Sequence, residues 1–169
     1  MKISLNYRFL IRLACKLILA TGILCFISMQ LFWEQQNPVP LWGQQSISTD
    51  LMTFSVVSGF ILTWVVTKCT RQALRQNKVL PLHWHLKSQT LIDRLPSHTF
   101  NRAFILALNS VFTSALLIQL LEWKNLNFMS HADYCILFVF YGVLLTIAVT
   151  VMSFYRALGD NFLRKSNVP

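Results

Sequence analysis

Apolar and charged positions fall into long separate blocks along this chain. Four stretches contain no Asp, Glu, Lys, Arg or His, namely residues 17–33, 51–67, 103–121 and 134–155. At about 1.5 Å of rise per helical residue, even a stretch of 17 residues reaches roughly 25 Å, which is close to the hydrocarbon thickness of a bilayer. The pattern predicts four transmembrane helices in one membrane domain over residues 1–169.

Composition supports a membrane protein over a soluble domain. Hydrophobic residues make up 54% of the chain and charged residues only 12%, about half the charged fraction of an ordinary soluble domain. The basic segment before the first stretch also resembles a signal peptide. The apolar run exceeds a signal core of about 7 to 15 residues and lacks a small-x-small cleavage site, so we expect a retained anchor.

The distribution of basic residues predicts the orientation. Lysine and arginine in short loops stay on the cytoplasmic side of a membrane. All but one of the 15 basic residues, Lys124, lie before the first stretch, between the second and third, or after the fourth. We therefore expect both termini in the cytoplasm. Insertion and anionic lipid explain the net charge of +9, so no nucleic acid is expected as a partner.

The loops differ in length and character. The cytoplasmic loop 68–102 begins with helix-forming residues that extend the second helix to about Lys78, and Ser97 or Thr99 can cap the third helix. Between them, apolar and basic residues mix as in a segment lying on lipid headgroups. The outer loops, 34–50 and 122–133, are shorter. They predict that the first helix lies beside the second and the third beside the fourth, in an antiparallel four-helix bundle.

Small and polar residues within the stretches indicate how the helices associate. Lipid leaves helix association to close packing and hydrogen bonds, and small residues four apart suit close packing. The candidates for packing, within the bundle or in a dimer, are Ser55, Gly59, Ala103, Ala107, Ser110, Ser114, Gly142 and Thr146.

Asn109 is the most polar side chain well inside a stretch. A buried amide strongly prefers a partner, so we expect a hydrogen bond across helices to Ser58 or Thr146. The functional interpretation of Asn109 is a polar substrate path.

The sequence predicts no catalytic site, cofactor or metal. Without ionisable side chains in the spanning stretches, a self-contained proton relay is not expected. His83 and His85 flank Trp84 without a nearby Cys, Asp or Glu to complete a zinc site. Phosphate-binding loops, nucleophile elbows and zinc-protease motifs are missing from the sequence.

Several short motifs resemble a group of small bacterial four-helix membrane proteins that are sometimes labelled permease-like and have no defined function. The motifs are Val39-Pro-Leu-Trp-Gly43, Asp50-Leu51, Thr70-Arg-Gln-Ala-Leu-Arg75, Val79-Leu-Pro-Leu82, Arg94-Leu-Pro96, Arg102-Ala103 and Arg156-Ala-Leu-Gly-Asp160. The resemblance implies a multi-pass protein of the bacterial cytoplasmic (cell inner) membrane and supplies no site residues.

Three functional hypotheses follow. The first is a non-enzymatic interaction or accessory module, whose partners are the lipid bilayer and either a second copy or another membrane protein. The second is a small permease-like transporter that works as an oligomer, since four helices enclose little polar volume. The third is an immunity or stress-related membrane protein. An enzyme is not expected.

Overall fold

Four long helices dominate the computed structural model, which describes residues 3–32, 38–43, 45–80, 96 and 98–159. The helices are α1 (Ile3–Phe32), α2 (Ile47–Arg75), α3 (Thr99–Trp123) and α4 (His131–Leu158). All four are, by length and composition, able to cross a membrane, which confirms the predicted number of apolar helices. Each helix extends beyond the uncharged stretch that predicts it, because the flanking polar residues continue the helix past the hydrocarbon.

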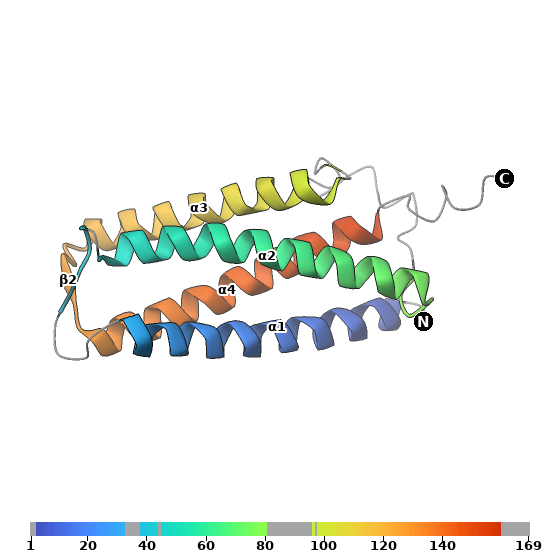
Figure 1. Ribbon diagram of the computed structural model, residues 1–169, viewed down its shortest axis with the longest axis horizontal. Helices are drawn as coiled ribbons and strands as arrows, with labels where there is room; N and C mark the ends of the chain where they lie inside the picture. Colours follow the sequence, from blue (N-terminus) through green and yellow to red (C-terminus); the bar gives the residue numbers. More distant parts are fainter. Residues whose placement is uncertain (1–2, 33–37, 44, 81–95, 97, 160–169) are drawn as a thin grey trace.

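The helices do not pair as the loop lengths predict. The extensive contacts join α2 to α3, α2 to α4 and α1 to α4, and the expected pairs, α1 with α2 and α3 with α4, pack much less. A short loop brings two helices together only at one end, whereas side-chain packing selects partners along the whole length. In Figure 1, α2 and α4 therefore occupy the centre of the arrangement and α3 and α1 its two edges.

Consecutive helices run in opposite directions, so the central pair, α2 and α4, is parallel. The hydroxyl of Tyr134, near the start of α4, donates to Asp50 Oδ2 near the start of α2 at 3.1 Å. Both helices run from there toward the end where α1 begins (Figure 1). We call this the basic end, and the opposite end, which holds the two short strands, the strand end.

The two connections at the strand end are joined by a small sheet that sequence patterns did not predict. Strand β1 (Val39–Pro40) pairs antiparallel with β2 (Phe128–Met129), with Val39 opposite Met129. Val39 and Leu41 are buried beneath it in a core that reaches along the bundle to Val149. The pairing closes the bundle at this end.

Polar residues set the helix ends. Ser46 caps α2 by accepting a hydrogen bond from the Thr49 N–H at 3.3 Å. Asn77 and Asn125 adopt positive φ angles of 54° and 56° just after α2 and α3. The left-handed turn lets the following amides reach the last free carbonyls of each helix. The helix α2 thus ends close to Lys78, the position predicted from the sequence. The helix α3 begins directly after His98, whose side chain forms no capping hydrogen bond.

Candidate functional site: a polar interior and an exposed intramembrane amide

A cluster of hydroxyl groups joins three helices inside the bundle. Tyr141 of α4 places its hydroxyl 2.7 Å from Ser55 Oγ of α2 and 3.2 Å from the Ser110 carbonyl oxygen of α3. Ser55 Oγ also lies 2.6 Å from the Leu51 carbonyl oxygen, to which it can donate. The Tyr141 hydroxyl donates to the Ser110 carbonyl, and its oxygen and Ser55 Oγ form a second hydrogen bond in which either can be the donor. The phenol is thereby satisfied without water, as burial in an apolar interior requires.

The predicted small residues lie at the helix contacts. A Cβ added to Gly59 would lie 2.7 Å from Ser110 Oγ and 3.0 Å from the Ala107 Cα, so α2 and α3 touch through their backbones there. A Cβ on Gly142 would lie 2.9 Å from Cys25 Sγ and 3.2 Å from Phe54 Cζ. Ser55, Ala103 and Ser114 are buried as well. These residues pack inside one copy of the chain, so they are not available as a dimer face.

The structure does not bring Asn109, Ser58 and Thr146 together. Asn109 is exposed, and its Nδ2 donates to the Ile105 carbonyl of its own helix at 3.1 Å. Ser58 likewise bonds within α2, and Thr146 lies 3.1 Å from Thr21 Oγ1 of α1. The expected bond from Asn109 to Ser58 or Thr146 is thus not formed: Asn109 and Ser58 bond within their own helices, and Thr146 bonds to α1 instead. Asn109 lies on an exposed side of α3. For the same reason Asn109 does not line an interior substrate path.

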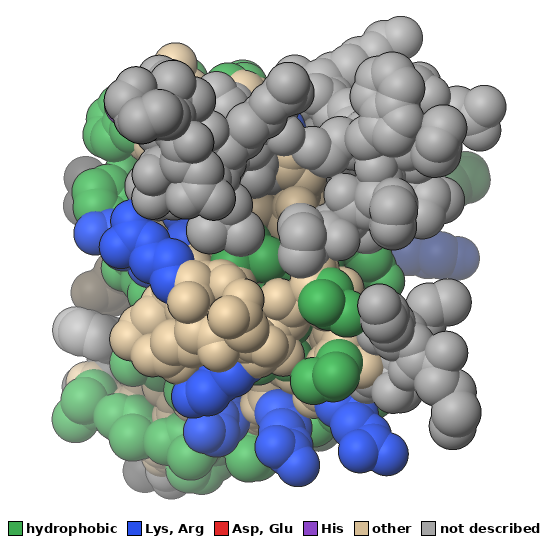
Figure 2. Space-filling view, turned by 90° about the vertical axis from the view of Figure 1, so that its right-hand side faces the viewer, with side chains coloured by type: hydrophobic (Ala, Val, Ile, Leu, Met, Phe, Trp, Pro, Cys, Tyr) green, Lys and Arg blue, Asp and Glu red, His purple; other side chains and the backbone are tan. Residues whose placement is uncertain are grey.

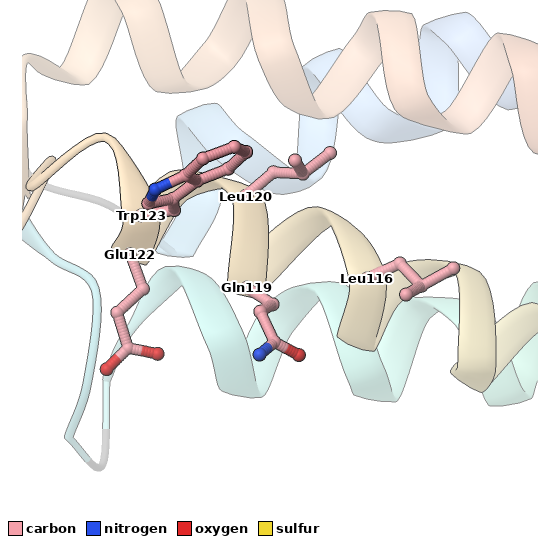
Figure 3. A pocket seen from close by; sticks show the side chains of 5 residues that line it. All are labelled: Leu116, Gln119, Leu120, Glu122 and Trp123. Atoms are coloured by element: carbon pink, nitrogen blue, oxygen red, sulfur yellow. The ribbon is translucent and has the colours of Figure 1, made fainter.

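Asn109 belongs to a continuous exposed surface of α3, which we call the back face. Its members recur at helical spacing and comprise Ile105, Asn109, Phe112, Leu116, Leu120 and Trp123. Near the strand end the back face is hollowed into a shallow pocket of about 530 Å³ lined by Leu116, Gln119, Leu120, Glu122 and Trp123. Figure 3 shows Leu120 and Trp123 on one side of the helix and Gln119 and Glu122 on the other.

Positive charge collects at the basic end. Among described residues, every lysine or arginine except Lys124 lies after α2 or in the half of its helix nearest this end. Figure 2 shows several of these side chains on this face, with no described Asp or Glu in view. Arg102, which the charge pattern treats as a loop residue, lies in the first turn of α3 and is fully buried. Its Nε donates to the Pro96 carbonyl at 3.3 Å. Sequence alone did not separate Arg102 from its exposed basic neighbours.

Other sequence predictions fall partly outside the described residues. His83, Trp84 and His85 lie there, as does most of the expected headgroup segment of loop 68–102. Within the described residues, no three His, Cys, Asp or Glu side chains gather in a metal-binding arrangement. Three buried hydroxyls, of Thr67, Thr150 and Ser153, have no hydrogen-bond partner among these residues. These hydroxyls lie on α2 and α4, nearer the basic end than the Tyr141 cluster, so the polar interior extends in that direction. The sequence did not predict this row of buried hydroxyls.

Comparisons with protein-family models, with curated proteins and with solved structures find no match to this chain. The architecture, with four helices able to cross a membrane, is that of a multi-pass membrane protein.

Proposed function

We propose that this chain is a non-enzymatic membrane module that works by lateral association, and that its partner on the back face of α3 is a second copy of the chain. The observation that carries the proposal is the amide of Asn109, which lies exposed within a spanning helix and bonds only to the Ile105 carbonyl among described residues. An amide facing lipid gains by meeting a polar group on another helix.

The chemistry of asparagine favours a second copy over an unrelated partner. A side-chain amide carries both donor and acceptor groups, so two Asn109 side chains facing each other across a two-fold axis can each donate and each accept. The place of α3 in the bundle supports this arrangement. Because α3 lies at an edge and packs extensively only on α2, its back face is open to a neighbour.

The proposal includes an orientation and a membrane. We place both termini in the cytoplasm of a bacterial cell, with the basic end at the cytoplasmic face of the inner membrane. Basic residues concentrated at one end support the orientation through the positive-inside rule. The strand end then faces outward, with the exposed side chain of Trp123 at the level of the opposite headgroups.

Self-association of the full-length protein in vesicles tests the proposal. Two preparations, one with a donor and one with an acceptor fluorophore, are reconstituted together, and energy transfer is measured as the protein is diluted with lipid. We expect concentration-dependent transfer for the unaltered protein. Asn109→Leu should lower the association constant about threefold to thirtyfold, since interhelical amide bonds contribute about 0.6 to 2 kcal/mol.

Two further variants make the result specific. Asn109→Gln keeps the amide and should retain part of the association. Thr53→Val removes an exposed hydroxyl from α2, away from the back face, and should leave it unchanged. A strictly monomeric protein at high protein-to-lipid ratio, or equal association of Asn109→Leu and the unaltered protein, would overturn the proposal.

A further inference from the structure

An apolar groove runs between α2 and α3 on the lipid-facing side of their contact. Its volume is about 370 Å³, and every lining residue is apolar: Val56, Val57, Phe60, Ile61, Phe104, Ala107, Leu108 and Val111. The groove lies beside the close approach of the two helices, since Ala107, which lines it, also meets Gly59 at the helix contact. The groove lies on a different side of α3 from Asn109 and the back face.

Toward the basic end, the same side of α2 changes from apolar to cationic. Trp64 follows Phe60 by one helical turn, with ring centroids 6.0 Å apart, and Phe100 of α3 packs edge-on against Phe60 at 5.6 Å. The next turn presents Lys68, which is exposed and places its Nζ 5.5 Å from the centre of the Trp64 ring. Aromatic rings followed by a cation match the transition from hydrocarbon to headgroups.

Two further features add positive potential where the groove reaches the basic end. Arg71 of α2 spans to α3, where its Nη1 donates to Thr99 Oγ1 at 2.7 Å. Thr99 is the first residue of α3, and a helix N-terminus carries a partial positive charge. An anionic group beside Lys68 therefore meets a lysine, a guanidinium and a helix N-terminus from two neighbouring helices.

From this arrangement we infer that the chain binds an anionic phospholipid, with an acyl chain in the α2–α3 groove and the phosphate group beside Lys68. From Val56 to Lys68 the helix rises about 18 Å, which gives an acyl chain an extended apolar path below the headgroup. The charge of the site selects an anionic over a zwitterionic lipid. The inference does not depend on self-association, because the groove and the back face are separate surfaces.

Native mass spectrometry of the full-length protein in detergent micelles tests the inference. The protein is mixed with equal amounts of phosphatidylglycerol and phosphatidylethanolamine that carry the same acyl chains, and the retained lipid is identified. We expect one retained phosphatidylglycerol in preference to phosphatidylethanolamine. Lys68→Gln should reduce its retention about fivefold, since a basic residue near an anionic surface contributes about 1 kcal/mol.

Matched variants separate the site from general lipid adhesion. Lys124→Gln removes the exposed lysine at the strand end and should retain lipid as the unaltered protein does. Val57→Trp fills the groove and should displace the lipid, whereas Ile136→Trp, at an exposed position on α4, should not. If Val57→Trp does not fold by circular dichroism, Leu108→Trp fills the groove from the α3 side. Equal retention of both lipids, or no loss with Lys68→Gln and a folded groove-filling variant, would overturn the inference.

Discussion

The hydroxyl of Tyr141 lies 2.7 Å from Ser55 Oγ and so connects the two central helices inside the bundle. The same hydroxyl reaches the Ser110 carbonyl, so one side chain bridges α2, α3 and α4. Loss of this hydroxyl would remove the hydrogen bonds that join α4 to α2 and α3 here, although Ser55 would keep its bond to the Leu51 carbonyl and the Ser110 carbonyl its bond from Thr113. Removal of the Tyr141 hydroxyl should therefore weaken contacts among three helices.

Tyr141→Phe should lower the free energy of unfolding by about 0.6 to 2 kcal/mol, the range of interhelical hydrogen bonds in membranes. The ring and its packing remain, so the change isolates the hydroxyl. Titration of SDS into micelles of the protein, followed by circular dichroism, measures the effect. Tyr155→Phe, at an exposed position near the end of α4, is the control and should change little. Equal stability of the two variants would contradict the bridging role.

Gly59→Ala should separate α2 from α3, because the added methyl meets the Ala107 backbone at 3.0 Å. Overpacking of this kind costs about 1 to 3 kcal/mol, which the same SDS titration would detect. Gly22→Ala provides the contrast, since nothing lies within 4 Å of a Cβ added in α1. That change should raise stability by about 0.5 to 1 kcal/mol through helix propensity. Similar effects of both substitutions would show that the contact at Gly59 is not tight.

The orientation predicts the activity of fusion proteins in bacterial cells. Alkaline phosphatase is active only outside the cytoplasm, so a fusion after Gly43 should be active and a fusion after Lys87 inactive. Expression levels measured by immunoblot serve as the control. The reverse pattern of activity would place the basic end outside.

The number of helices and their approximate positions could be predicted from the sequence because hydrocarbon excludes charge over a fixed thickness. The helix contact at Gly59 could also be predicted from the sequence, since small residues four apart favour close packing. Such patterns are local along the chain. They depend on residue type and spacing, which the sequence states directly.

The identity of the neighbouring helices could not be read in the same way. The short loop between α3 and α4 predicted that these two helices pack together. The side chains that select helix partners, such as Tyr141 and Ser55, lie 86 positions apart in the chain. Whether Asn109 is buried or exposed depends on which helices pack against α3, so its exposure could not be predicted from the sequence either. Arg102 looked like any other loop cation because its burial depends on how the start of α3 packs.

The packing of α1 almost exclusively on α4 has a consequence for biosynthesis. The first helix enters the membrane long before its partner is made, and its large apolar side chains, such as Leu19 and Leu24, face lipid even in the finished bundle. The four helices therefore complete their insertion before the bundle can close, as expected for assembly in two stages. A chain truncated before α4 would keep three membrane-spanning helices yet lose both the extensive partner of α1 and the strand-end contact of Tyr134 with Asp50.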